Sequence, residues 1–170
     1  MLNKKVEKAL NEQIEKEHYA SQLYLAMASW TEVKGYNGTA TFLYKHSQEE
    51  REHMLKLFHY VNDRGGHAIV PKVDQPPQEY KSIQDLFEAI YEHELMVSAS
   101  INELMSTSSG VKDYATQNFL QWYVEEQMEE ETLFRTILDK LQLLGNKEAN
   151  MYMFDNEMSR LADSVDGGDE

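Results

Sequence analysis

The chain has 170 residues, 41% of them hydrophobic, enough for one well-packed core and short for two. Its 30 acidic residues outweigh 16 Lys and Arg, giving a formal net charge of -14 at pH 7. Nucleic acids and anionic membranes bind cationic patches, so we expect neither as a partner. The absence of cysteine excludes disulfides and thiolate metal sites. The N-terminal residues are charged and no apolar run approaches the ~18 residues of a membrane span. We therefore expect no signal peptide and a cytoplasmic location.

Four long helices are predicted from apolar residues that recur at alternating steps of three and four. They are expected at about residues 4–33, 39–64, 82–109 and 112–143, each ending close to a glycine. Ser82 with Asp85 is typical of a capping box at the start of the third helix.

A shorter fifth helix is expected over about 147–162, with Asn146 as its N-cap. Isolated helices of this length are marginal in water, so its apolar side chains must pack against something. These side chains are Met151, Phe154, Met158 and Leu161. We expect one domain over residues 1–163, followed by a disordered acidic tail at 164–170.

The connection between the second and third helices, "GGHAIVPKVDQPPQEY", holds all three prolines of the chain. At ~3.3 Å per residue it is long enough to run the length of a 30-residue helix. It is predicted to be a crossover that makes the third helix parallel to the second; a floppy loop is the alternative. A helical bundle with one long crossover is a known scaffold for metal sites in its core.

Polar residues interrupt all four apolar stripes near their middle. Glu50 follows Glu17 by 33 residues, and Gln127 follows Glu94 by the same interval. Three residues after these come His53 and Glu130, respectively. In a hairpin with a short turn, this spacing places both members of a pair at about the same height.

Several buried carboxylates at one level repel each other, and each is costly unless it is paired or bound to a metal. Carboxylates with one imidazole and no thiolate suit iron or manganese, and also accept zinc. Two helices that supply a single Glu and two that supply a paired motif follow the plan of di-iron carboxylate bundles. A dinuclear centre is therefore predicted, against the alternative that the four interruptions coincide by chance.

Three segments, "EKEHYASQLYLAMASW", "HSQEEREHMLKLFHYVNDRGG" and "NFLQWYVEEQMEEE", together with the crossover and the short fifth helix, resemble the ferritins, most closely the prokaryotic non-haem type. The resemblance covers essentially the whole chain. It implies an all-α, ferritin-like four-helix bundle with a long crossover and a short fifth C-terminal helix. It also implies a hollow shell of 24 identical subunits that stores iron as ferric mineral. The implied activity is ferroxidase, the oxidation of Fe(II) by dioxygen or hydrogen peroxide.

The resemblance also assigns residues to a non-haem di-iron centre and to a third iron site. The ligands of the first iron are Glu17, Glu50 and His53, and those of the second are Glu50, Glu94 and Glu130, with Gln127 beside the pair. The third site takes Glu49, Glu126 and Glu129, with Glu130. Tyr24 matches a tyrosine next to the centre, either as a core aromatic or with a redox role, and Trp122 is more weakly placed.

The other histidines are expected to be surface or supporting residues; they are His18, His46, His59, His67 and His93. The fourth helix has no histidine, which separates the chain from haem-binding bacterioferritins. In the resembling family the fifth helix lies near the four-fold axis of the shell; the alternative is that it folds back on its own subunit. Two other functions stay open. One is a di-iron oxygenase or peroxidase acting on an organic substrate, for which the filled bundle leaves little room, and the other is a non-catalytic shell protein.

Overall fold

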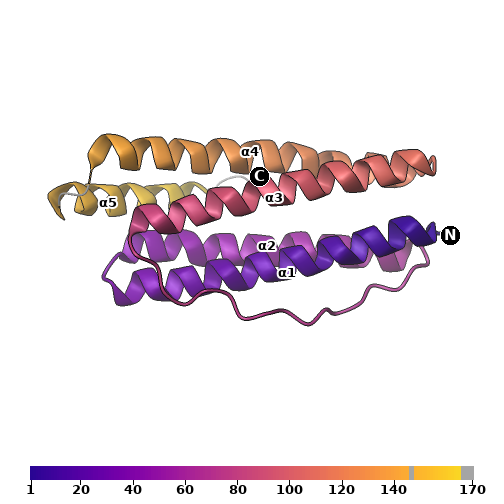
Figure 1. The fold of residues 1–170 in the computed structure, drawn as a ribbon, viewed down its shortest axis with the longest axis horizontal. Helices are drawn as coiled ribbons and strands as arrows, with labels where there is room; N and C mark the ends of the chain where they lie inside the picture. Colours follow the sequence, from indigo (N-terminus) through magenta and orange to yellow (C-terminus); the bar gives the residue numbers. More distant parts are fainter. Residues whose placement is uncertain (146–147, 166–170) are drawn as a thin grey trace.

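The computed structural model describes residues 1–145 and 148–165, and all regular structure in these ranges is helical. The helices are α1 (Lys4–Val33), α2 (Asn37–Asp63), α3 (Ile83–Gly110), α4 (Tyr114–Leu144) and α5 (Glu148–Val165). The first four form an elongated bundle, and the shorter α5 lies along one end of it (Figure 1). The predicted all-α bundle with a fifth helix is therefore confirmed. No helix among the described residues is long and apolar enough to cross a membrane.

The starts of α3 and α4 are set by side-chain caps. The Ser82 hydroxyl accepts a hydrogen bond from the backbone N–H of Asp85 at 3.0 Å, as the capping box predicted. The Asp113 carboxylate accepts from the backbone N–H of Thr116 at 3.2 Å. Because Asp113 is the cap, α4 begins at Tyr114 rather than at the expected residue 112.

Glycines with positive φ stand just beyond three helices. Gly35 (φ +88°), Gly65 (φ +73°) and Gly145 (φ +64°) take up positive φ values, which glycine adopts without steric cost, where α1, α2 and α4 end. The predicted N-cap of the fifth helix, Asn146, lies outside the described residues.

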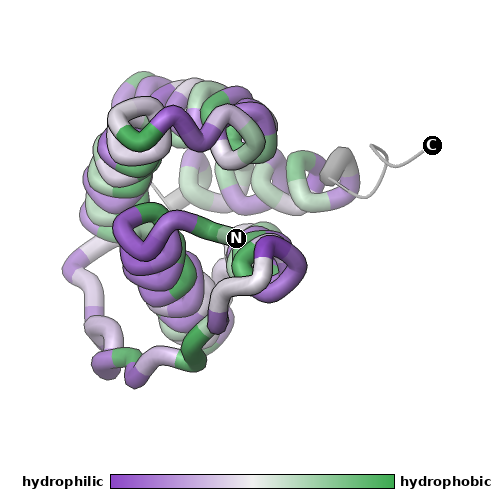
Figure 2. The backbone as a smooth tube through the Cα atoms, turned by 90° about the vertical axis from the view of Figure 1, so that its right-hand side faces the viewer, coloured by the Kyte–Doolittle hydropathy of each residue, from purple (hydrophilic) through white to green (hydrophobic). Residues whose placement is uncertain are grey.

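The connection between α2 and α3 runs back along the outside of the bundle, on the side away from α5 (Figures 1 and 2). It makes α3 parallel to α2, so the crossover prediction is confirmed. Side chains of α1 attach it to the bundle. Asn11 Oδ1 accepts from the backbone N–H of Ile69 at 2.8 Å, and the Trp30 indole donates to Glu79 at 3.1 Å. These contacts argue against the floppy-loop alternative.

The core consists of two apolar clusters with a polar layer between them. The α5-end cluster is built around the buried residues Tyr24, Met27, Phe42, Leu43, Phe87, Ile90, Phe134, Phe154 and Met158. The N-terminal-end cluster is built around Val6, Leu10, Ile14, Leu57, Val61, Val97, Ile101, Leu120 and Tyr123. Every one of α1 to α4 contributes to both clusters. Each also contributes to the polar layer, which comprises Glu17, Glu50, His53, Glu94, Gln127 and Glu130, all at most 8% exposed.

Helix α5 folds back on its own subunit. It buries Phe154, Met158 and Ala162 against the bundle, with Met151 and Leu161 partly buried beside them. The alternative considered for this helix is therefore the arrangement that the chain adopts within one subunit. The helix extends through Val165, so the first two residues of the expected tail are helical. The rest of that tail, 166–170, lies outside the described residues.

An acidic residue of α5 caps the start of α2. The Asp155 carboxylate accepts from the backbone N–H groups of Gly38 at 3.0 Å and Thr39 at 2.8 Å, and from the Thr39 hydroxyl at 2.8 Å. The backbones come so close that a Cβ on Gly38 would lie 2.0 Å from the Asp155 carbonyl oxygen. The start of α2 and the middle of α5 thus form one packing unit.

Candidate metal centre

The residues predicted from the 33-residue spacing do lie at one level. One ligand atom from each of Glu17, Glu50 and His53 lies within 4.8 Å of the others. In the second hairpin, Gln127 Nε2 is 3.0 Å from Glu94 Oε2. Tyr24 of the first hairpin donates a hydrogen bond to Glu94 of the second, so the two halves of the polar layer meet in the middle of the bundle.

The group formed by Glu17, Glu50 and His53 has acceptor atoms without donors. Glu17 Oε2 and His53 Nδ1 are buried and have no hydrogen-bond partner. His53 Nδ1 lies 3.6 Å from Glu50 Oε2, which is too long for a hydrogen bond. Buried acceptors that face one another without a donor are costly, and a cation removes that cost. As metal ligands, two carboxylates and an imidazole suit iron, manganese or zinc.

Glu94 is held differently. Tyr24 donates to one of its oxygens and Gln127 to the other. Among the described residues Glu94 belongs to no group of three ligand atoms within 4.8 Å, so Glu50, Glu94 and Glu130 are not gathered as closely as the first set. Its charge still acts on both of the others, since it adds to burial in raising the pKa of Glu50 and of Glu130. The second set is thus close enough to interact, with Glu94 turned toward hydrogen-bond donors.

Two further groups of ligand atoms meet at Glu49. One comprises His46, Glu49 and Glu130, and the other Glu49, His53 and Glu126. Each shares one residue with the polar layer, so both lie directly beside it.

Of the residues expected at the third site, Glu129 belongs to no such group in the described part of the chain. It lines the same hollow as Glu49 and Glu126. Its charge also helps to raise the pKa of Glu49 and of Glu130.

Burial and mutual repulsion make the carboxylates of this region reluctant to ionise. Burial, followed by the charges of Glu17 and Glu94, raises the pKa of Glu50 well above its ordinary value. Burial raises the pKa of Glu94 to about 7, although hydrogen bonds from two neighbours oppose the shift. Burial and the charge of Glu126 also raise the pKa of Glu49 to about 7. Such groups bind either protons or cations.

An open hollow of about 1330 Å³ leads to the polar layer from the side of α2 and α4. Helix α1 has Cα atoms within 8 Å of Cα atoms in α2 and in α3, and α3 has such neighbours in α4. Among the described residues, no Cα atom of α2 lies within 8 Å of one in α4. The hollow occupies this gap. Its acidic lining comprises Glu49, Glu52, Glu126, Glu129 and Glu130. The expectation that the bundle leaves little room beside the centre is wrong at this hollow, where the backbones of α2 and α4 lie apart.

The histidines expected to be surface or supporting residues include both exposed and buried side chains. His59 and His67 are exposed, as expected. His46 is 1% exposed and stands among the candidate ligands, with Nδ1 3.1 Å from the Phe42 carbonyl oxygen and Nε2 3.8 Å from Glu130. Its place in the apolar stripe of α2 was the available signal, since a polar residue there is buried. His93 is also buried, and its Nε2 has no hydrogen-bond partner.

The two aromatic candidates lie on different sides of the layer. Tyr24 is fully buried and hydrogen-bonded to Glu94, so it is both a core aromatic and a neighbour of the centre. Trp122 stacks on Tyr123 with ring centroids 4.5 Å apart and lies 5.4 Å from the His53 ring. It lines the hollow, together with Lys56 over its ring.

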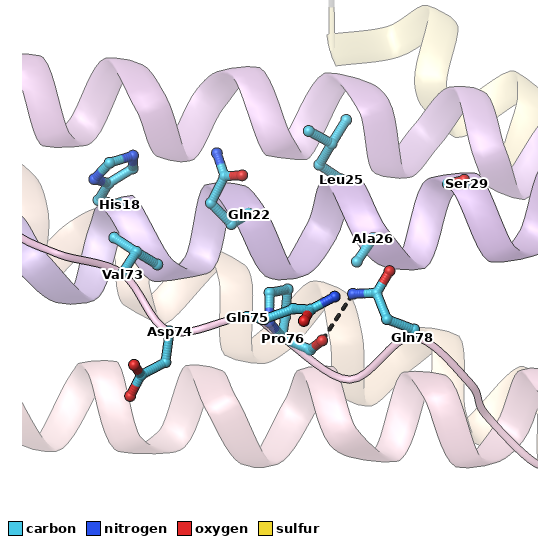
Figure 3. A pocket seen from close by; sticks show the side chains of 10 residues that line it. All are labelled: His18, Gln22, Leu25, Ala26, Ser29, Val73, Asp74, Gln75, Pro76 and Gln78. Atoms are coloured by element: carbon cyan, nitrogen blue, oxygen red, sulfur yellow. Dashed lines mark hydrogen bonds between the residues drawn. The ribbon is translucent and has the colours of Figure 1, made fainter.

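A second hollow, of about 550 Å³, lies on the outer side between α1 and the crossover (Figure 3). Its polar lining includes His18, Gln22, Asp74 and Gln78. Asp74 is its single carboxylate, with a side chain 91% exposed, and none of the groups of ligand atoms involves this region. The metal chemistry of the described residues therefore belongs to the polar layer and its hollow.

Comparisons with known proteins agree with this geometry. The family described as ferritin-like domain matches residues 7–144. Over 162 residues the chain is 46% identical to a probable bacterial non-heme ferritin-like protein of Haemophilus influenzae, covering 95% of this chain and 98% of that protein. It is 47% identical to the bacterial non-heme ferritin of Campylobacter jejuni, covering 95% and 97%. A crystal structure of an open pore ferritin from the hyperthermophilic archaeon Archaeoglobus fulgidus superimposes with a TM-score of 0.91 at 41% identity, covering 93% of this chain and 96% of that one. The chain belongs to the ferritin family and resembles its bacterial non-heme members.

Proposed function

We propose that this chain is an iron-storage subunit with ferroxidase activity, which oxidises Fe(II) at the polar layer and stores ferric mineral in a hollow shell. The observation that carries the proposal is the cluster of Glu17, Glu50 and His53, in which two buried atoms, Glu17 Oε2 and His53 Nδ1, have no hydrogen-bond partner. A layer of this kind destabilises a core, and divalent cations relieve the repulsion. The names of the relatives, bacterial non-heme ferritins, support iron as the cation.

In the proposed reaction, Glu17 and His53 hold the first Fe(II) and Glu94 and Glu130 hold the second. Glu50, between the two sets, serves both ions. Each Fe(II) gives one electron, and dioxygen takes two electrons and two protons to leave as hydrogen peroxide. Tyr24 and Gln127 orient Glu94 through their hydrogen bonds. Peroxide, as the alternative oxidant, accepts the same two electrons and yields water.

The hollow between α2 and α4 is the proposed passage for iron. Glu49, Glu126 and Glu129, with Glu130, form a third site there, at which further Fe(II) or newly formed Fe(III) is held. Glu49 is a ligand candidate in two of the groups. An ion can therefore be passed from His53 or Glu130 to Glu49 without losing all of its ligands at once.

Storage requires an enclosed space, which one bundle does not provide. We propose a homo-oligomer, a shell of 24 subunits, located in the cytoplasm. The high negative charge of the chain suits iron cations and neither nucleic acid nor an anionic membrane as a partner.

A di-iron oxygenase or peroxidase acting on an organic molecule is the second candidate, because the hollow has room for such a substrate. Its acidic lining favours cations over apolar or anionic molecules. Storage therefore remains the better supported function.

Anaerobic titration with Fe(II), followed by admission of air, tests the proposal. Storage predicts rapid oxidation and retention of many more than three iron ions per chain. An oxygenase retains two or three ions, and a non-catalytic shell protein oxidises none of them rapidly.

Glu50→Ala is expected to abolish rapid oxidation and to remove both tight sites together, since Glu50 serves both ions. Glu17→Ala is expected to remove mainly the first site. Rapid oxidation by Glu50→Ala at the wild-type rate would overturn the assignment of Glu50 to both ions.

A further inference from the structure

One buried polar side chain beside the centre has no evident purpose in the fold. Gln13 is 1% exposed and lies on α1 one turn before Glu17, next to the apolar side chains of Leu10 and Ile14. Burying a primary amide costs free energy, and an apolar residue of equal length would fill the same space. A buried glutamine at this position therefore indicates a neighbouring group that its amide hydrogen-bonds.

That partner is Glu17. Gln13 Nε2 donates to Glu17 Oε1 at 2.6 Å, and both side chains are fully buried. Glu17 Oε2, by contrast, has no hydrogen-bond partner. One oxygen of the carboxylate is thus fixed by the amide and the other has no donor, while the carboxylate belongs to the group that includes Glu50 and His53.

The direction of the amide is fixed from α3. The Ser100 hydroxyl lies 2.7 Å from Gln13 Oε1 and 2.7 Å from the Val97 carbonyl oxygen, so its one proton is shared between these two acceptors. With Ser100 as donor, the Gln13 oxygen points to α3 and the NH₂ group points to Glu17. The opposite orientation would place the amide oxygen against a carboxylate oxygen, and two acceptors repel.

We propose that Gln13, oriented by Ser100, is a positioning residue for the first metal site, which it tunes by making Glu17 a ligand through one oxygen only. The proposal rests on the proposed function, since it assigns Glu17 to the first ion. Side chains that hold a metal ligand in place typically change metal affinity on the order of 10- to 100-fold when they are replaced. The second site, built around Glu94 and Glu130, has no contact with Gln13 and keeps its affinity.

The test is a titration of the metal-free protein with Co(II) under nitrogen, followed by calorimetry and by the visible absorption of bound cobalt. Glu17→Ala and Glu94→Ala identify the signal of each site. Gln13→Met keeps the length of the side chain and removes the amide. It is expected to weaken the first site about tenfold, to alter its cobalt spectrum and to leave the second site unchanged.

Two further variants separate positioning from packing. Ser100→Ala leaves Gln13 in place and is expected to shift the cobalt spectrum of the first site in the same direction by a smaller amount. Ser100→Thr keeps the hydroxyl group and is expected to give the wild-type spectrum. Gln22→Met makes the same exchange on α1 at the outer hollow and is expected to change neither site (Figure 3).

Wild-type cobalt affinity at both sites of Gln13→Met would overturn the proposal, while leaving the proposed function intact. Equal weakening of both sites, together with a lower free energy of unfolding of the metal-free protein, would also overturn it by assigning Gln13 to packing. Failure of the wild-type chain to bind cobalt at either site would overturn the proposed function along with it.

Discussion

The two apolar clusters and the polar layer between them obey opposite rules. The clusters bury aromatic and aliphatic side chains that gain free energy by leaving water. The layer, on the same four helices, buries carboxylates whose charges repel one another. The ends of the bundle therefore raise the free energy of unfolding, and the polar layer in the middle, which suits metal binding, lowers it. Substitutions in the two regions should have opposite signs in the metal-free protein.

The largest effect is expected from the α5-end cluster. Phe87 is fully buried and its ring meets those of Phe42, Phe134 and Phe154 at centroid distances of 6.5, 6.4 and 5.7 Å. Phe87→Ala removes these contacts and leaves a cavity, so the free energy of unfolding should fall by about 3–5 kcal/mol. Urea unfolding of the metal-free protein at fixed concentration measures it. A loss below about 1 kcal/mol would show that this end of the core is loosely packed.

A smaller loss is expected where α5 meets α2. Gly38→Ala places a methyl group 2.0 Å from the Asp155 carbonyl oxygen, so α5 must shift. Strain of this kind typically costs about 1–3 kcal/mol. Hydrogen exchange should show α5 and the first turn of α2 opening together, with the polar layer still protected. Gly110→Ala, which meets nothing within 4 Å, is the matched control. Unchanged protection of α5 in Gly38→Ala would contradict the tight packing.

In the polar layer a substitution should raise, rather than lower, the free energy of unfolding of the metal-free protein. Glu130→Gln replaces a carboxyl group whose ionisation is disfavoured by burial and by the charges of Glu94 and Glu49. The new amide can also donate to His46 Nε2, which lies 3.8 Å from Glu130 Oε1. The metal-free protein should therefore gain roughly 0.5–2 kcal/mol of stability while losing affinity at the second site, as expected for a site that trades stability for function. A destabilised variant would contradict the repulsion on which the comparison rests.

The difference between the two regions was visible in the sequence for a definite reason. Apolar stripes follow helical periodicity, and the 33-residue interval from Glu17 to Glu50 fixes their relative height, so the layer could be located from spacing alone. The four long helices and the crossover were predictable on the same grounds.

Other features depend on side-chain directions that no spacing encodes. Gln13 contacts Glu17 of the layer, yet nothing in the sequence separates it from glutamines on the surface. The hollow could not be predicted, because it depends on the separation of α2 and α4, which no local pattern encodes. The capping of α2 by Asp155 joins residues more than 100 positions apart, which is beyond the reach of local patterns.

The smallest effect expected from a single group is the contribution of Glu94 to a pH dependence that distinguishes the layer from the clusters. Glu94 has a pKa of about 7 in the folded chain because of burial, and Glu50 and Glu130 have theirs raised well above the ordinary value. In the unfolded chain these groups are ionised at neutral pH. The folded protein then binds more protons than the unfolded one, so its stability falls as pH rises, by less than about 1 kcal/mol for a group like Glu94 between pH 7 and 8.5.

Buried histidines act in the opposite direction at lower pH. Burial lowers the pKa of His46 and His93 to about 4, so stability from these groups rises with pH as the unfolded chain loses its histidine protons near pH 6.5. The window from pH 7 to 8.5 lies above most of that transition. Urea unfolding of the metal-free protein should show a decline there, and Glu130→Gln should reduce it. With Zn(II) bound the slope should reverse, because the metal competes with protons for the same oxygens. A flat profile in the metal-free protein would mean that these carboxylates are as ionised in the folded chain as in the unfolded one, and it would contradict their raised pKa values.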